Sequence, residues 1–122
     1  MPDQGPDDDR PDDDRPYDVA ATVAVLDEVL AERAAQQAAR GSVSHPDGTG
    51  RAYTPAATAA REACQAAFQA GRGTWRHILA EEVAEAFAED DDVALRAELI
   101  QVAAVSVAWA EAIDARSRSG QG

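Results

Sequence analysis

The sequence is poor in several residue types that stabilise small proteins. It has one cysteine, no lysine, and two residues each of tryptophan, tyrosine and phenylalanine among 122 positions. Because Cys64 stands alone, an internal disulfide and a cysteine-based zinc site are both excluded. Most of the 45% hydrophobic content is alanine. We therefore expect one helical domain with a core of small side chains.

Basic charge and long apolar runs are also scarce. The sequence has eleven arginines and 23 acidic residues, and its net charge of −12 argues against the basic surface that nucleic acid polymers require. The apolar stretch Val102 to Ala110 is interrupted by Ser106 and has about half the length of a membrane span. The acidic N-terminus lacks the apolar segment of a secretory signal. We therefore expect a cytoplasmic protein that binds neither nucleic acid polymers nor membranes.

About half of the negative charge lies near the N-terminus. Residues 1–18 contain eight aspartates, two arginines and four prolines, a net charge of −6, and include a near-repeat of Pro-Asp-Asp-Asp-Arg. Such a segment cannot bury enough apolar surface to fold. The composition predicts a disordered acidic tail over 1–18, a helical domain over 19–117 and a frayed C-terminus over 118–122.

Apolar residues recur at helical spacing in the remaining chain and predict four helices. Gly41 ends the first, Thr74 is a suitable N-cap for the third, and an aspartate run begins the fourth. A loop rich in Gly, Pro and Ser separates the first two, with a length typical of functional or mobile loops. The helices are expected over residues 19–40, 56–70, 74–89 and 92–116. The predicted fold class is all-α, an antiparallel four-helix bundle unit.

Polar side chains interrupt the apolar faces of the third and fourth expected helices. Glu82 and Glu85 share one stripe, with Glu81 beside them, and Glu98 and Gln101 share a face of the next helix. If the turn lies midway between the two groups, antiparallel packing makes these side chains converge. Burying carboxylates is costly unless a cation or donor compensates them. A divalent cation is the simplest compensation.

A second acidic pair, Glu111 and Asp114, also has Glu-x-x-Asp spacing. It is therefore an alternative to Glu98 and Gln101 as the group that meets the glutamates of the third helix. It begins about thirteen residues beyond Glu98, which is roughly 20 Å further along a helix. There it would face the start of the third helix and not its glutamates. We therefore interpret Glu111 and Asp114 as helix-surface charges.

The glutamate spacing resembles that of a known family, the MazG-like all-α nucleoside triphosphate pyrophosphohydrolases. The hallmark of that family is Glu-Glu-x-x-Glu and, after a spacer, Glu-x-x-Asp on two antiparallel helices. Glu81, Glu82 and Glu85 match the first half, and Glu98 matches the second, with Gln101 in the aspartate position.

Two further segments extend the resemblance to about residues 20–116. Residues 31–36 are similar to a Glu-Arg-x-x-Gln segment of some members, and residues 45–50 to a His-Pro-Asp-Gly loop. The resemblance implies a MazG-like four-helix unit that hydrolyses a nucleoside or deoxynucleoside triphosphate to the monophosphate and pyrophosphate, with Mg²⁺ or Mn²⁺. Control of nucleotide pools and removal of aberrant nucleotides both fit this activity.

The same resemblance implies a role for each glutamate. Glu82, Glu85 and Glu98 become metal ligands, joined by Gln101, whose amide oxygen can ligate but carries no charge. Glu81 becomes the catalytic base that orients water, or a further ligand. These roles agree with the chemistry of Mg²⁺, which prefers hard oxygen ligands and shares its coordination sphere with substrate phosphates.

Several further residues are candidates for contacts with the substrate. Each of them also has an interpretation in which it only stabilises the fold. Arg76 and Arg96 are suited to clamp phosphates, but pairing with nearby acids is the favoured interpretation. His45 and Asp47 belong either to a lid over the substrate or to a turn.

Five other residues complete the set of candidates. Glu32 and Gln36 are candidates for the nucleotide pocket. Trp75 and Trp109 either stack a base or pack in the core. His77 either serves the site or pairs with a glutamate on the surface.

Two other classes of protein stay open. A di-iron or di-manganese bundle would need Glu-x-x-His pairs on two helices, which this sequence lacks. A catalytically silent, dimerising scaffold or regulator with a residual metal site is the main alternative, because Gln101 replaces an acid. A unit so poor in large apolar residues also needs a partner to cover Val102, Val105 and Trp109. We therefore predict a homodimer or higher homo-oligomer.

Overall fold

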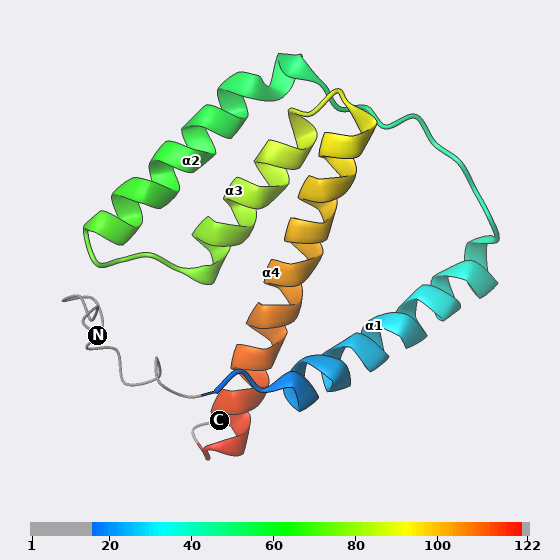
Figure 1. Ribbon diagram of the computed structural model, residues 1–122, viewed down its shortest axis with the longest axis vertical. Helices are drawn as coiled ribbons and strands as arrows, with labels where there is room; N and C mark the ends of the chain where they lie inside the picture. Colours follow the sequence, from blue (N-terminus) through cyan, green and yellow to red (C-terminus); the bar gives the residue numbers. More distant parts are fainter. Residues whose placement is uncertain (1–15, 121–122) are drawn as a thin grey trace.

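The computed structural model describes residues 16–120, and over this range the chain is all-helical (Figure 1). The predicted all-α class is therefore confirmed. The first 15 residues of the predicted acidic tail lie outside the described range. The elements are α1 (Val19–Arg40), the short 3₁₀ turn η2 (Arg51–Tyr53), α2 (Thr54–Gln69), α3 (Trp75–Phe87) and α4 (Asp92–Arg118).

Side-chain caps set the starts of three helices. Asp18 accepts a hydrogen bond from the Ala21 amide at 3.0 Å, and Asp91 caps α4 in the same way. At α3, the Thr74 hydroxyl oxygen accepts from the backbone amide of His77, and His77 Nδ1 accepts from the backbone amide of Thr74, each at 3.2 Å. This reciprocal capping box satisfies two amides that the helix leaves unpaired. His77 thus caps α3 instead of pairing with a glutamate.

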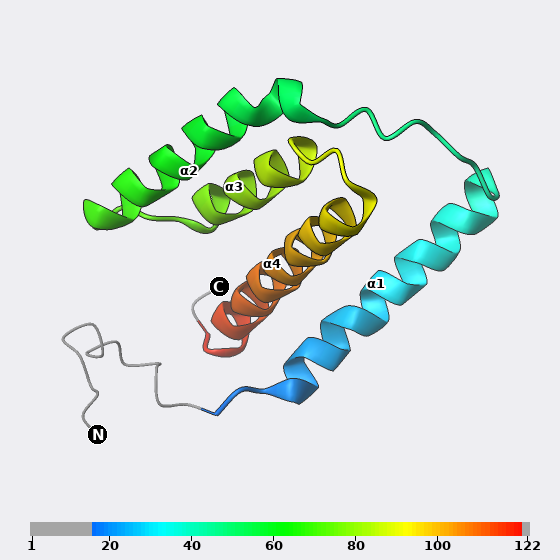
Figure 2. The same cartoon turned by 45° about the horizontal axis from the view of Figure 1, so that its top comes forward.

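Helices α2, α3 and α4 lie side by side, with α3 in the middle and neighbouring helices antiparallel (Figures 1 and 2). Helix α1 packs against α4 near the N-terminal end of α1 and lies apart from α2 and α3 in both views. Among residues 16–120, α2, α3 and α4 therefore form an antiparallel layer from which α1 diverges, and the antiparallel four-helix bundle unit stays a prediction.

The buried core is small and consists of side chains no larger than valine. Its members, each 9% exposed or less, are Val25, Ala57, Cys64, Ala67 and Ala86. Four of the five belong to α2 and α3, so the close contact of these two helices depends on alanine-sized side chains. The expectation of a core packed from small residues is confirmed for the described chain.

The two tryptophans stack on each other. Trp75 at the start of α3 faces Trp109 of α4, with ring centroids 6.3 Å apart and planes inclined by 10°. This pair joins the two helices at the end of the hairpin opposite its turn, in the near-parallel stacking that aromatic rings favour when they are offset. Val102, Val105 and Trp109 are all half-buried, so the face that we expected a partner to cover is partly covered within the chain.

The loop between α1 and α2 is attached to the α3–α4 turn at its far end. The Gly50 amide donates to the Phe87 carbonyl at 2.9 Å, and Arg51 pairs with Asp90 at 3.8 Å. Gly50 has φ of +147°, a backbone conformation that favours glycine. This attachment positions the start of α2 beside the end of α3.

Helix α4 is long and apolar enough to cross a membrane by composition. An 18-residue window within it has a mean hydropathy of 1.5, and 6% of that window is buried. The core helix of a water-soluble protein meets the same criterion. The apolar character of α4 therefore extends beyond the Val102 to Ala110 stretch that we considered from sequence.

Candidate metal centre

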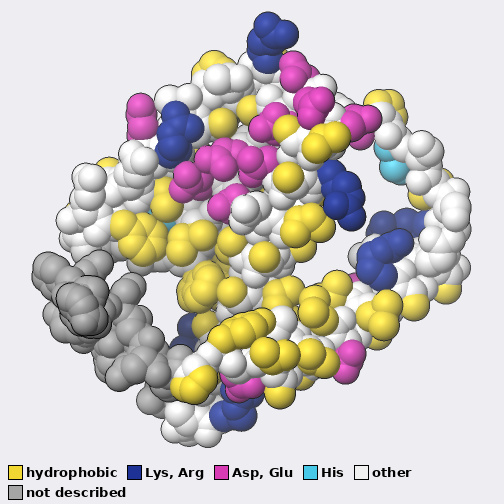
Figure 3. Space-filling model, viewed as in Figure 1, with side chains coloured by type: hydrophobic (Ala, Val, Ile, Leu, Met, Phe, Trp, Pro, Cys, Tyr) yellow, Lys and Arg dark blue, Asp and Glu magenta, His cyan; other side chains and the backbone are white. Residues whose placement is uncertain are grey.

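Three carboxylates converge where α3 and α4 face each other. One oxygen from each of Glu82, Glu85 and Glu98 lies within 4.8 Å of the other two, and all three side chains are half-buried. Acidic side chains gather over these helices on the face shown in Figure 3. Three of the residues that helix spacing predicted to meet are thus brought together.

The local sequence explains this convergence. Glu82 and Glu85 are three residues apart on α3, which places both carboxylates on one face of the helix. The connection to α4 is short, because α3 ends at Phe87 and α4 begins at Asp92. The antiparallel return therefore brings Glu98, in the second turn of α4, opposite the second half of α3.

Burial and like charge both act on these carboxylates. Burial raises the pKa of Glu85 to about 7, aided by the charge and hydrogen bonding of Glu81 and by the charges of Glu98 and Glu82. Burial also raises the pKa of Glu82, with the charges of Glu98 and Glu81 as further causes. Burial and like charge both disfavour the ionised form of these two carboxyl groups. The cluster therefore favours uptake of a proton or of a cation.

Glu81 connects the cluster to α2. It neighbours the buried thiol of Cys64, where burial, hydrogen bonding to Glu81 and the charges of Glu81 and Glu82 raise the thiol pKa. Cys64 was considered from sequence only as a disulfide or zinc residue. The sequence carried no signal that Cys64 faces Glu81.

The geometry fits the size of a magnesium ion. Oxygen ligands at about 2.1 Å from Mg²⁺ lie at most about 4.2 Å apart, so small side-chain rotations would bring the three carboxylates to coordinating distance. Gln101 differs from them because it is exposed on α4. Its amide is therefore more open to solvent than the three carboxylates.

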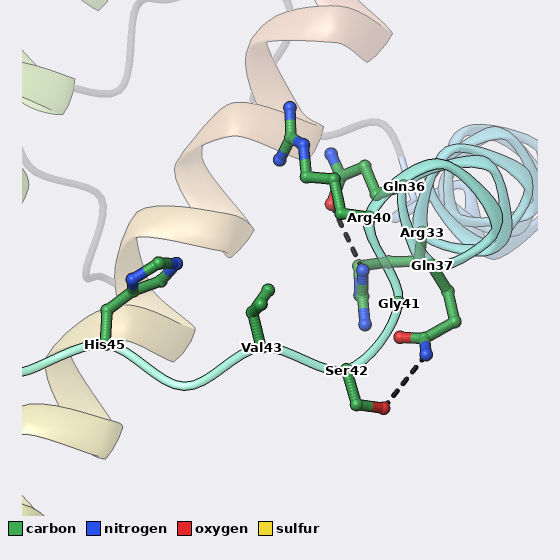
Figure 4. Close-up of a pocket in the computed structure, with 8 residues that line it drawn as sticks. All are labelled: Arg33, Gln36, Gln37, Arg40, Gly41, Ser42, Val43 and His45. Atoms are coloured by element: carbon green, nitrogen blue, oxygen red, sulfur yellow. Dashed lines mark hydrogen bonds between the residues drawn. The ribbon is translucent and has the colours of Figure 1, made fainter.

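Two of the predicted substrate residues line a different pocket. Gln36 and His45 belong to an open cavity of about 370 Å³ at the C-terminal end of α1, together with Arg33 and Arg40 (Figure 4). Arg33 donates to the Gln36 side-chain oxygen at 3.1 Å. None of the three clustered glutamates lines this cavity, and α1 lies apart from α3 (Figure 1).

The other four candidates are exposed. Glu32 lies on α1, Asp47 in the loop, Arg76 in the first turn of α3, and Arg96 on α4 two residues before Glu98. Of these, Arg96 is nearest in sequence to the glutamate cluster. The ion pair described within residues 16–120 joins Arg51 and Asp90 and involves none of them.

Glu111 is not the surface charge that we expected. It is half-buried, and Thr22 of α1 donates to its carboxylate at 2.6 Å. The Tyr17 hydroxyl in turn donates to Thr22 at 2.7 Å. These two hydrogen bonds stabilise the contact between α1 and α4. Spacing along α4 could not reveal it, because the donor lies 89 residues away.

The chain has no match among protein-family models, curated proteins or solved structures. The functional interpretation therefore depends on the residues and geometry of the cluster.

Proposed function

We propose that this protein is a metal-dependent nucleoside triphosphate pyrophosphohydrolase, with Glu82, Glu85 and Glu98 as its metal ligands. The observation that supports this proposal most strongly is the convergence of their carboxylates within 4.8 Å in a half-buried setting. Three such groups repel one another unless a cation or protons compensate their charge. The hard oxygen donors suit Mg²⁺ or Mn²⁺.

The bound cation would neutralise phosphate charge and lower the pKa of a coordinated water. The residues of the chain supply position and proton transfer. Glu82 and Glu85 from α3 and Glu98 from α4 would hold the ion. Glu81, adjacent in sequence and close to Glu85, accepts the proton of the water that attacks the α-phosphorus. The products are the nucleoside monophosphate and pyrophosphate.

The more specific parts of the proposal depend on the resemblance to the MazG-like family. It supplies the triphosphate substrate, the four-helix unit and the role of Gln101 as a neutral member of the coordination shell. In this proposal Arg96, which is exposed on α4, contacts a phosphate through its guanidinium group. Nucleotide-pool control and house-cleaning are both compatible with the activity.

The direct test is a panel of ribonucleoside and deoxyribonucleoside triphosphates incubated with the purified chain and Mg²⁺. We expect release of pyrophosphate and not of orthophosphate, at a rate that EDTA abolishes. Glu82→Gln and Glu98→Gln should each lower turnover by at least about 100-fold. Glu28→Gln, an exposed glutamate on α1, is the matched control and should leave turnover unchanged.

A silent scaffold is the second candidate function, because Gln101 is neutral and exposed. It predicts Mg²⁺ binding that Glu82→Gln weakens, with no turnover of any nucleotide in the panel. Absence of both Mg²⁺ binding and turnover would refute the metal site itself.

A further inference from the structure

A basic pocket lies at the C-terminal end of α1, away from the glutamate cluster. It is the open cavity of about 370 Å³ shown in Figure 4, with α1 on one side and His45 of the following loop on the other. Its lining includes two arginines and no acidic residue, whereas the net charge of the chain is −12. The pocket therefore has a charge opposite to that of the chain as a whole.

Four polar side chains of α1 line the pocket because they share one face of the helix. They recur at spacings of three, one and three residues and are Arg33, Gln36, Gln37 and Arg40. Every one of them carries N–H donors. This face of α1 therefore offers positive charge and several hydrogen-bond donors to a single ligand.

Hydrogen bonds order both sides of the pocket. The Arg33 guanidinium donates to the Gln36 side-chain oxygen at 3.1 Å, and the Gln37 amide donates to the Ser42 hydroxyl at 3.0 Å. Gly41, with φ of +72°, turns the chain at the end of α1, and its amide donates to the Gln37 carbonyl at 2.7 Å. The loop is thereby held against the end of the helix. Such ordering before a ligand binds lowers the entropic cost of binding.

No acidic side chain neutralises the two arginines in the part of the chain that the structure describes. The ion pair described within residues 16–120 joins Arg51 to Asp90. Arg40 lies in the last turn of α1, where its charge complements the helix dipole. Arg33 lies about two turns earlier, beyond the reach of that effect. The positive charge of Arg33 is therefore available to a ligand.

We infer that this pocket binds the diphosphate group of a small anion, without a metal ion and independently of the glutamate cluster. Guanidinium groups bind phosphate oxygens through paired, charge-assisted hydrogen bonds. Arg33 and Arg40 begin about 10 Å apart along the helix axis, so two linked phosphates reach both side chains more readily than one phosphate does. A carboxylate has two oxygens, fewer than the donor side chains that line the pocket.

Calorimetric titration of the full chain with inorganic pyrophosphate tests the site. The titration is done in EDTA at low ionic strength, so that no metal ion links pyrophosphate to the glutamate cluster. We expect one pyrophosphate per chain, and Arg33→Gln and Arg40→Gln should each raise Kd at least about tenfold. The carbonyl groups at the end of α1 repel an anion, so the arginines must supply the attraction.

Arg116→Gln is the matched control, because it removes an exposed arginine from the last turn of α4. It should change Kd by no more than about twofold. Absence of binding at millimolar pyrophosphate would overturn the inference. An equal loss of affinity in the control and in the two α1 variants would also overturn it, because the effect would then reflect net charge alone.

Further titrations identify the source of the diphosphate group. Inorganic phosphate should bind at least about tenfold more weakly than pyrophosphate, because it meets only one guanidinium group. Equal affinity for the two anions would refute the role of both arginines. Binding of ADP as well as pyrophosphate would confirm the inference and identify the diphosphate end of a nucleotide. Binding of pyrophosphate without ADP would confirm it for the free anion.

Two measurements separate this pocket from the metal centre and cover variants that fail to fold. Glu82→Gln should leave the Kd for pyrophosphate in EDTA within about twofold of the wild-type value. A tenfold change would place the ligand at the glutamate cluster and refute the pocket. In amide NMR spectra of the wild-type chain, pyrophosphate should shift the signals of residues 33–45. Shifts confined to α3 and α4 would contradict the inference.

Discussion

Glu85 on α3 and Glu98 on α4 hold carboxylate oxygens within 4.8 Å of each other, and both side chains are half-buried. Two anions so close, and half-buried, oppose each other in the metal-free protein. The same pair would attract a divalent cation. Stability of the metal-free chain and affinity for metal should therefore respond in opposite directions to changes in the cluster.

Glu98→Gln should show this opposition directly. Burial is the main cause of the raised pKa of Glu82, and the charge of Glu98 adds to it. Removing that charge relieves the repulsion, so the melting temperature in EDTA should rise by a few degrees. The further rise caused by millimolar Mg²⁺ should shrink, because a ligand is lost. Thermal melts with and without Mg²⁺ measure both effects. If both melts shift downward equally, Glu98 has only a packing role.

Lowering the pH from 8 to 6 should stabilise the metal-free protein. The pKa of Glu85 rises from 4.5 to about 7 on folding, chiefly through burial. Between these values the folded state binds a proton that the unfolded chain does not, so the free energy of unfolding increases as the pH falls through about 7. Denaturant titrations in EDTA at the two pH values measure this change. Glu85→Gln should abolish it, and an equal response in that variant would assign the effect to other groups.

Mg²⁺ affinity should fall over the same pH range. A proton on Glu85 competes with the cation for the same oxygens, so calorimetric titrations should give weaker binding at pH 6 than at pH 8. Proton release on binding should be measurable near pH 7 from the dependence of the heat on buffer ionisation. Identical affinity at both pH values would remove Glu85 from the coordination shell.

Thr22→Val should loosen α1 from α4. The substitution removes the donor that satisfies Glu111 in a partly buried contact, at a cost of about 1–3 kcal/mol in the free energy of unfolding. Thr22→Val combined with Glu111→Leu should regain most of the loss, because neither polar group is then left unpaired. Denaturant unfolding of the two single variants and the double variant gives the coupling energy. Strictly additive losses would show that the two residues do not act as a pair.

The Cys64 thiol should resist alkylation in the folded protein. It is buried, and burial together with Glu81 raises its pKa, which keeps it protonated and unreactive. Modification by iodoacetamide should become fast only in denaturant. Rapid labelling under native conditions would contradict the packing of α2 against α3.

Local rules explain how much of this structure was predictable. Periodicity located all four helices, and Thr74 and Gly41 marked a start and a stop because caps act within one turn of the chain. Helix spacing also predicted the meeting of Glu82, Glu85 and Glu98. Two adjacent helices with a short turn leave few alternatives for which residues face each other.

These local rules could not predict contacts between segments that are far apart in the sequence. The positions of Gln36 and His45, expected near the substrate, depend on where α1 lies, and α1 is separated from α2 by a long loop. The burial of Glu111 depends on Thr22, far away in sequence. Spacing along one helix carries no information on either contact.

The sequence by itself determined the helical class, the alanine-sized core and the meeting of three glutamates, since each follows from spacing along one helix or across one short turn. Only the tertiary structure decided that α1 diverges from the other helices and that Trp75 stacks on Trp109. Those features depend on which apolar helix faces from distant segments are buried against one another. Only the packing of the whole chain determines these contacts.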